Sequence, residues 1–168
     1  MPRKPQEEVK ADCFPPDFRD ILTLLHVHDV RYMIVGGGAI IFYGHARFTG
    51  DLDIFYEREA ANTQRLYACL REFWQGDVPS VESAAELLKE HQVIQFGVPP
   101  NRLDLLNGIQ GVEFAQAWPR RRIARCALPE REIVVNYLGP DDLIRNKTMV
   151  GRPKDKEDVR FLEKRKRD

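Results

Sequence analysis

Short apolar runs bounded by glycine, proline or charged residues recur along the chain, and they predict β-strands. The clearest run covers residues 32–35, because it is fully apolar and stops at three consecutive glycines. Further strands are predicted at residues 52–56, 93–96 and 102–106, and a hairpin is predicted at residues 122–127 and 133–137.

Apolar side chains spaced three or four positions apart predict helices between these strands. Phe18, Ile21, Leu22 and Leu25 make one such face after Asp17, which is a good helix cap. Helices are also predicted at residues 39–43, 60–74, 83–90 and 111–118, from 141 or 142 to 150, and from 155 onward. This alternation predicts an α/β (α+β) fold, in which helices flank a mixed, twisted sheet. The connections are too irregular for a doubly wound Rossmann fold.

The length and composition predict one domain with its own core. The chain has 168 residues, of which 43% are hydrophobic and 31% charged. Residues 1–16 are rich in charge and end in Pro15-Pro16, so we expect a flexible N-terminal arm before a single domain at residues 17–168. The formal net charge is zero, so any contact with nucleic acid must come from a local patch. Arg120, Arg121, Arg122 and Arg125 form a local basic cluster, which is either a solvated face or an RNA-facing groove, and alternation along a strand would put Arg120 and Arg122 on the same side.

The cysteines and the apolar runs predict where the protein resides. Cys13, Cys69 and Cys126 are widely spaced and form no CxxC pair, which argues against a disulfide framework or a zinc site. The apolar runs are too short to cross a bilayer, and residues 1–10 lack the apolar core of a signal peptide. We therefore expect a cytoplasmic protein without a membrane partner.

Three aspartates in strand-like settings are the strongest candidates for chemistry. Asp51 and Asp53 are two positions apart, so on a strand both side chains project from the same face. Asp104 lies between Leu103 and Leu105 on a later predicted strand, and the three carboxylates converge if the two strands are neighbours. Carboxylates this close repel one another unless cations lie between them. Mg²⁺ or Mn²⁺ suits such hard oxygen ligands, and a pair of ions roughly 3.5–4 Å apart suits nucleotidyl transfer.

Glycines at the end of an earlier strand are candidates for binding phosphate. Gly36 and Gly37 follow the apolar run at residues 32–35 and precede a short predicted helix. Backbone N–H groups at such a position face outward, and glycine lets a phosphate approach closely. A simple turn is the alternative for the glycines, and a solvated strand edge is the alternative for the aspartates.

The order of these features resembles the signature of the DNA polymerase β-like nucleotidyltransferase superfamily. The run of Val35, Gly36, Gly37, Gly44, Arg47, Thr49, Asp51 and Asp53 is similar to the small stand-alone branch, which includes abortive-infection toxins. Asp142, Lys147, Arg152 and Asp155 resemble the C-terminal part of that branch, so the resemblance covers residues from about 30 to 160. This chain departs from the branch at Gly37, where many members have serine, and at Tyr43-Gly44-His45, where many have His-Gly before the arginine.

The resemblance implies a metal-dependent enzyme that moves a nucleotide from an NTP, such as ATP, to a hydroxyl acceptor. Asp51, Asp53 and Asp104 would hold the metals and carry the catalysis, while Gly36 and Gly37 would bind the triphosphate. Lys147 and Arg152 are expected to contact the triphosphate by the same resemblance. Arg47 either contacts phosphate or pairs with Asp51, and Thr49 caps the turn or contacts the substrate.

Three kinds of hydroxyl acceptor stay open. A tRNA end, a protein hydroxyl and a small molecule all fit, and the resemblance adds a toxin–antitoxin role with a cognate antitoxin as partner. Two other functions stay open: a catalytically silent nucleotide-binding or protein-interaction domain of the same fold, and a metal-dependent phosphohydrolase.

Overall fold

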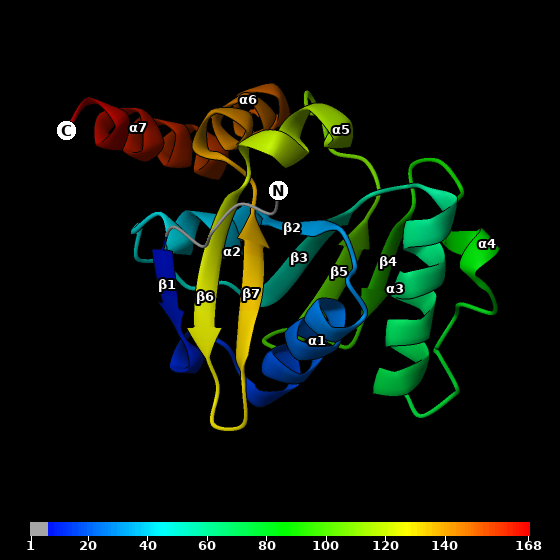
Figure 1. The fold of residues 1–168 in the computed structure, drawn as a ribbon. Coiled ribbons are helices and arrows are strands. Elements are labelled where there is room, and N and C mark those ends of the chain that lie inside the picture. Colours follow the sequence, from blue (N-terminus) through cyan, green and yellow to red (C-terminus); the bar gives the residue numbers. More distant parts are fainter. Residues whose placement is uncertain (1–6) are drawn as a thin grey trace.

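A seven-stranded mixed sheet forms the centre of the protein in the computed structural model, which describes residues 7–168 (Figure 1). The strands lie in the order β1-β6-β7-β2-β3-β5-β4. Their bounds are β1 Glu7–Lys10, β2 Tyr32–Val35, β3 Asp51–Tyr56, β4 Val93–Phe96, β5 Arg102–Leu106, β6 Arg122–Ala127 and β7 Glu132–Tyr137. The pairs β1–β6, β7–β2 and β3–β5 are parallel, and the other neighbours are antiparallel. The predicted fold class is therefore confirmed.

Helices cover one face of the sheet and one of its ends. Their bounds are α1 Pro16–Val27, α2 Gly36–Phe42, α3 Ala60–Phe73, α4 Ala84–Leu87, α5 Phe114–Ala117, α6 Pro140–Val150 and α7 Pro153–Arg167, with 3₁₀ turns η1 Ala11–Cys13 and η2 Trp118–Arg120. Figure 1 shows α1 and α3 in front of the sheet, and α5, α6 and α7 together at its upper end. The opposite face of β3 and β5 is left for the site.

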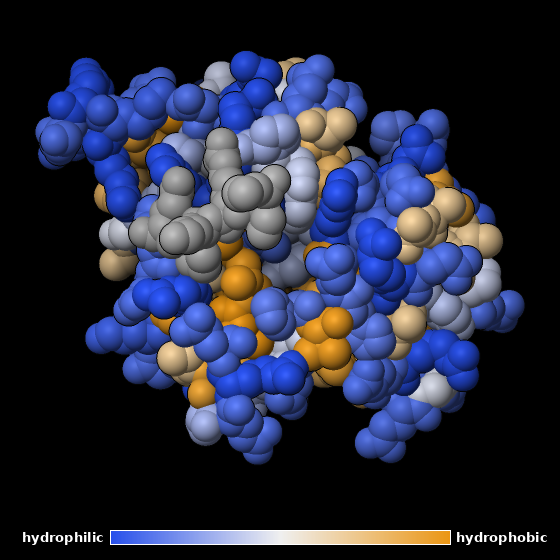
Figure 2. Space-filling model, viewed as in Figure 1, coloured by the Kyte–Doolittle hydropathy of each residue, from blue (hydrophilic) through white to orange (hydrophobic). Residues whose placement is uncertain are grey.

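The two-residue period of β3 separates the core from the site. Leu52 and Ile54 are buried in the hydrophobic core, together with the predicted apolar face of α1. Asp51 and Asp53 point to the other face, because successive strand side chains alternate. Hydrophilic side chains cover most of the molecular face seen in Figure 2, as the high charged fraction predicts. Among residues 7–168, no helix is both long and apolar enough to cross a membrane.

Most predicted elements are confirmed, and the differences lie at their ends. The helix predicted at 83–90 is only Ala84–Leu87, and the one predicted at 111–118 is divided between α5 and η2. α2 begins at Gly36 rather than at residue 39, because the glycines themselves form its first turn. α7 continues to Arg167, although its basic end has few apolar side chains.

The flexible arm expected at residues 1–16 is wrong for residues 7 onward. Glu7–Lys10 pairs in parallel with β6, from Glu7 opposite Ala124 to Lys10 opposite Ala127. Arg19 also holds the following turn, because its Nε donates to the carbonyl oxygens of Ala11 and Phe14, each at 2.8 Å. Residues 1–6 of the expected arm lie outside the described residues.

Candidate active site

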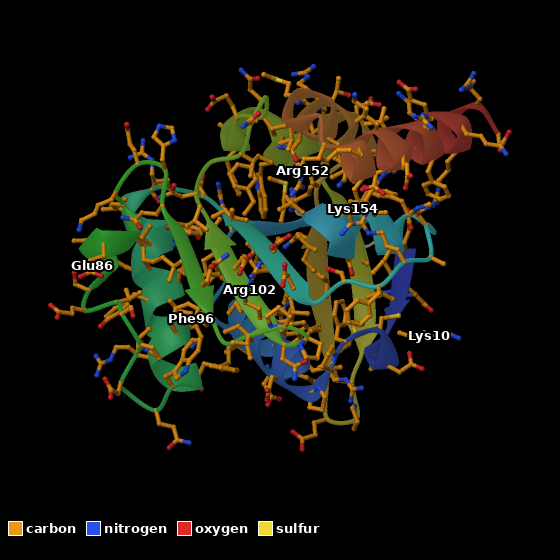
Figure 3. The ribbon with its side chains drawn as sticks, turned by 180° about the vertical axis from the view of Figure 1, so that it is seen from behind. Lys10, Glu86, Phe96, Arg102, Arg152 and Lys154 are labelled. Atoms are coloured by element: carbon orange, nitrogen blue, oxygen red, sulfur yellow. The ribbon has the colours of Figure 1, made fainter. Side chains whose placement is uncertain are left out.

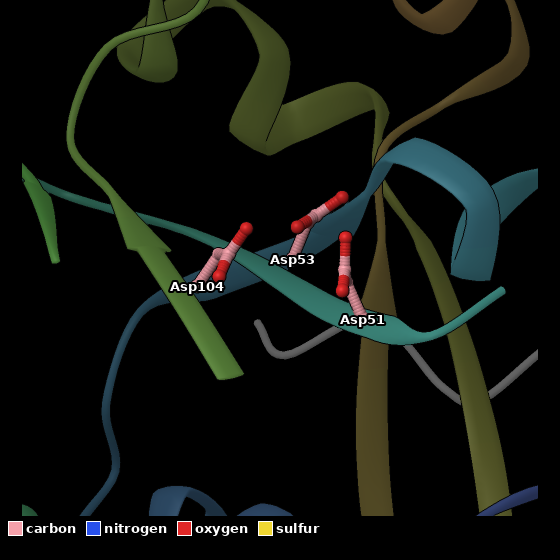
Figure 4. A group of neighbouring side chains, drawn as sticks. All are labelled: Asp51, Asp53 and Asp104. Carbon is pink, nitrogen blue, oxygen red and sulfur yellow. The ribbon is translucent and has the colours of Figure 1, made fainter. Parts of the chain in front are cut away.

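The register of β3 and β5 brings the three predicted aspartates together. Asp53 lies directly opposite Asp104, and Asp51 lies opposite Arg102. One carboxylate oxygen from each aspartate lies within 4.8 Å of the others, and the three side chains project from the same side of the two strands (Figure 4). The convergence predicted from the sequence is therefore present.

Burial and mutual repulsion make this cluster electrostatically unusual. Asp104 is only 6% exposed. Burial raises the pKa of the Asp53 carboxyl to about 7, and the neighbouring charges of Asp104 and Asp51 act in the same direction. Full ionisation of all three groups therefore calls for additional positive charge.

Arg102 is a member of the site that the sequence reasoning missed. Its Nη2 donates to Asp51 Oδ2 at 2.8 Å and to Asp104 Oδ2 at 3.1 Å, and its Nε donates to Asp104 Oδ1 at 2.9 Å. Figure 3 shows Arg102 on the face seen from behind. The sequence did hold a signal for this role. Arg102 is two positions before Asp104 on the predicted strand, so both side chains lie on the same face of the sheet.

The carboxylate cluster fits a divalent cation. Asp51 Oδ1 is buried and has no hydrogen-bond partner among the described residues, which leaves an anionic oxygen without compensation. Together with the carboxylate of Asp53, it offers hard oxygen ligands of the kind that Mg²⁺ and Mn²⁺ prefer. The donor set therefore suits these ions and does not suit a soft metal.

The predicted glycine turn lies directly against the carboxylates. Gly36 has φ +63°, and a Cβ atom at this position would lie 2.2 Å from Asp53 Oδ2. A Cβ atom at Gly37 would lie 2.8 Å from Thr49 Oγ1. Both positions therefore require glycine if Asp53 and Thr49 stay in place. The Thr49 hydroxyl also lies 3.5 Å from the backbone N of Asp51, as expected for a residue in the turn before β3.

Arg47 lies beside the glycine turn but does not pair with Asp51. Its Nη1 donates to Asp158 Oδ2, and its Nη2 is 3.6 Å from the position of a Cβ atom on Gly37. Asp158 is 1% exposed and comes from α7, so the C-terminal helix fixes this arginine. Arg47 therefore forms an ion pair, but its partner is Asp158 and not Asp51 as predicted.

Lys147 is buried in an ion-pair network rather than pointing into open space. Its Nζ lies 3.2 Å from Asp155 Oδ1 and 2.8 Å from Asp158 Oδ2. Burial opposes ionisation of both carboxyls, but hydrogen bonds from Arg152 and Lys147 to Asp155, and from Lys147 and Arg47 to Asp158, hold both pKa values below their usual range. Asp155 also caps α7, because its carboxylate accepts a hydrogen bond from the backbone N of Arg152. Asp158 is shared by Lys147 and Arg47, so it joins α7 to α6 and to the loop before β3.

Arg152 keeps an exposed side chain near the site. The side chain is 70% exposed although its Nε donates to Asp155 Oδ2 at 2.8 Å. The hydrogen bond to Asp155 raises the pKa of Arg152 most, and the charge of Asp53 contributes to the same shift. Figure 3 shows Arg152 and Arg102 from the same side of the molecule. Arg152 is thus a cation that a bound anion can reach.

The basic cluster at residues 120–125 is engaged within the protein. Arg120 belongs to η2 rather than to β6, so strand alternation does not place it beside Arg122 as expected. Arg120 Nη2 donates to Asp142 Oδ1 at 2.7 Å, the guanidinium of Arg121 stacks 3.6 Å from the Trp118 ring centre, and Arg125 donates to Glu8. Arg120 and Arg125 stay about half exposed, at 50% and 45%, while paired within the protein, so these contacts favour the solvated face over the RNA-facing groove.

Comparison with known families agrees with this geometry. The sequence profile of a family described as "Nucleotidyltransferase of unknown function (DUF6036)" matches residues 17–163. No curated protein matches the chain.

Proposed function

This chain belongs to the DUF6036 family of nucleotidyltransferases, and on that premise we propose that it transfers a nucleoside monophosphate from an NTP to a hydroxyl acceptor. The observation that carries the proposal is the cluster of Asp51, Asp53 and Asp104 beside the Gly36 turn. Candidate metal ligands and a glycine turn, the two features that the reaction requires, lie next to each other at this one place.

The aspartates are the proposed ligands of Mg²⁺ or Mn²⁺. Asp51 and Asp53 contribute most, because Arg102 already occupies both oxygens of Asp104. A bound divalent ion neutralises phosphate charge and lowers the pKa of a coordinated hydroxyl. The sequence predicts two ions, and the position of Arg102 among the three carboxylates changes that expectation.

The other site residues bind and orient the nucleotide in this proposal. Gly36 and Gly37 let backbone N–H groups approach the triphosphate, with Thr49 supporting the turn. Arg152 contacts the triphosphate directly, because its side chain is exposed. Lys147 acts indirectly: it holds Asp158, which in turn holds Arg47 beside Gly37.

The proposed reaction is an in-line displacement at the α-phosphorus. The acceptor oxygen forms a bond to this phosphorus, and the bond to the bridging oxygen of pyrophosphate breaks. Asp104 is proposed to accept the acceptor's proton, because it lies on the strand next to Asp53 and is fixed by Arg102. The products are nucleotidyl-acceptor and pyrophosphate.

The acceptor is proposed only as a hydroxyl on a tRNA end, a protein or a small molecule. A toxin role in the cytoplasm, neutralised by a cognate antitoxin, rests on the resemblance of residues 35–53 to abortive-infection enzymes. Growth arrest on expression of the wild-type chain, but not of Asp53→Asn, would support the toxin role.

The test is transfer of radiolabel from each of four α-labelled NTPs to total cell RNA and protein, with pyrophosphate measured in parallel. We expect labelled acceptor and an equal amount of pyrophosphate in Mg²⁺ or Mn²⁺, and neither with Asp53→Asn. Orthophosphate release without labelled acceptor would indicate a phosphohydrolase. NTP binding without any turnover would indicate a catalytically silent domain.

A further inference from the structure

The guanidinium of Arg102 lies among the three carboxylates, where a second metal ion would otherwise be expected. We infer that Arg102 permanently takes the place of one cation, so that the protein itself holds a single divalent ion at Asp51 and Asp53. This inference rests on the proposed function, because it concerns the metal site of that same reaction.

The backbone fixes Arg102 at the site. The residue lies on β5 directly opposite Asp51, and β5 is paired on both sides, to β3 and to β4. Its Cα therefore cannot move away without breaking strand pairing. Its side chain is 28% exposed, so much of it is enclosed by its neighbours.

Both oxygens of Asp104 are already used by this arginine. Oδ1 accepts from Arg102 Nε at 2.9 Å and Oδ2 accepts from Nη2 at 3.1 Å. Gln95 Nε2 lies 3.4 Å from the same Oδ2, on the β4 side. A two-pronged arginine–carboxylate pair is strong and directional, because the planar fork of donors matches the carboxylate. Asp104 is therefore poorly placed to bind a metal ion as well.

The remaining oxygens are those of Asp51 and Asp53. Asp51 Oδ2 accepts from Arg102 Nη2 at 2.8 Å, while its Oδ1 is buried without a partner. Arg102 thus pairs with Asp104 and with one oxygen of Asp51, and the other oxygen of Asp51 is left without a hydrogen-bond donor. This asymmetry gives one place for a cation.

Formal charges lead to the same conclusion. Three ionised aspartates carry −3, and Arg102, which stays protonated at any physiological pH, brings the total to −2. One divalent ion balances this charge. A second ion would leave +2 before any phosphate binds and would lie close to the guanidinium, where like charges repel.

The experiment counts bound Mn²⁺ at pH 8 without nucleotide, by titration with MnCl₂ and electron paramagnetic resonance of the free ion. We expect one ion per chain for the wild type and two for Arg102→Ala. Arg102→Lys keeps the charge and should bind one. Arg58→Ala is the matched control, because Arg58 pairs with Glu90 at the far end of β3 and should leave the count at one. Circular dichroism checks that each variant is folded.

Several results would contradict the inference in distinguishable ways. Two ions in the wild type, or one in folded Arg102→Ala, would overturn the role of Arg102 and leave a metal-dependent transferase intact. No bound Mn²⁺ in the wild type would overturn the metal site of the proposed function as well. If Arg102→Ala does not fold, the spectrum of bound Mn²⁺ in the wild type decides: an isolated ion supports the inference, and a spin-coupled pair overturns it.

Discussion

Asp53 and Asp104 lie directly opposite each other on the parallel strands β3 and β5, so their carboxylates share one face of the sheet. Asp104 is buried and Asp53 is partly buried, so their negative charges repel each other, and we expect an added cation to stabilise the fold. The site and the stability of the domain are therefore linked, and this link can be measured.

We expect Mg²⁺ or Mn²⁺ to raise the melting temperature, because an ion that binds only the folded state stabilises it, by about 2.7 kcal/mol at a hundred times its dissociation constant. Asp53→Asn should lose most of this shift, since it removes a ligand. Asp77→Asn, on an exposed loop, is the control and should keep it. A full metal-induced shift in Asp53→Asn would mean that the metal binds elsewhere.

Gly37→Val should weaken NTP binding by at least about tenfold, corresponding to about 1.4 kcal/mol. The added side chain meets the Thr49 hydroxyl, which a Cβ atom alone would approach to 2.8 Å. Mn²⁺ binding should be kept, because the carboxylates lie on β3 and β5. Calorimetric titration with a non-hydrolysable NTP analogue measures both.

Gly108→Ala is the matched control for the glycine turn, because its Cβ would have only an ordinary contact at 3.8 Å from His91 Nδ1. Gly36→Ala should differ from both variants and lose metal as well as nucleotide, since its Cβ would collide with Asp53 Oδ2. Equal NTP affinity in the wild type and Gly37→Val would mean that the glycines form a simple turn and do not bind phosphate.

Arg152→Gln should lower NTP affinity while changing stability little. A charge-assisted contact to phosphate contributes about 1.5–3 kcal/mol, or roughly 10- to 150-fold in affinity. The side chain is 70% exposed, so little packing is lost. Arg160→Gln, on the exposed side of α7, is the control for a change of net charge. If the two variants bind the analogue equally well, Arg152 does not contact the nucleotide.

Lys147→Met should destabilise the protein by about 3–5 kcal/mol, because it leaves Asp155 and Asp158 as buried charges without their shared lysine. Lys166→Met removes an exposed ion pair with Asp141 and should cost at most about 1 kcal/mol. Urea unfolding at pH 7 compares the two. Similar losses in both variants would contradict a structural role for the buried network.

The same network predicts sensitivity to acid. The pKa values of Asp155 and Asp158 are lower in the folded protein than in the unfolded chain, so the unfolded chain binds more protons as the pH falls. Their stabilisation is complete above the ordinary carboxyl pKa of about 4 and is lost as the pH falls through the lower folded values. Urea unfolding at pH 7, 5 and 3 should show that the free energy of unfolding of the wild type falls below pH 5. The difference in the free energy of unfolding between the wild type and Lys147→Met should become smaller over the same pH range.

The sequence predicted the acidic site because its information is local. The spacing of Asp51 and Asp53, and the leucines on both sides of Asp104, determine which face each side chain takes. Arg102 was missed because its contact with Asp51 depends on the register between two strands that are far apart in the chain. With another register, a different residue of β5 would lie opposite Asp51.

The ion-pair partners of Arg47 and Lys147 could not be predicted from local sequence patterns either. Both cations meet Asp158, which lies more than ten residues after Lys147 and on another helix than the one carrying it. From the sequence, Asp158 is one more acid near the start of an amphipathic helix. Only the packing of α6 against α7 shows that it is buried.

The short strand β1 has a consequence for how the protein behaves in concentrated solution. Without it, the six-residue strand β6 would form the outer edge of the sheet and present unpaired backbone groups to other molecules. β1 replaces this edge with four residues, three of which are charged: Glu7, Glu8 and Lys10. A short, charged edge is a poor template for adding a further strand. A chain shortened to begin at Asp17, where the family match starts, would keep the three aspartates and Arg102, and we expect it to aggregate more readily because β6 is then the exposed edge.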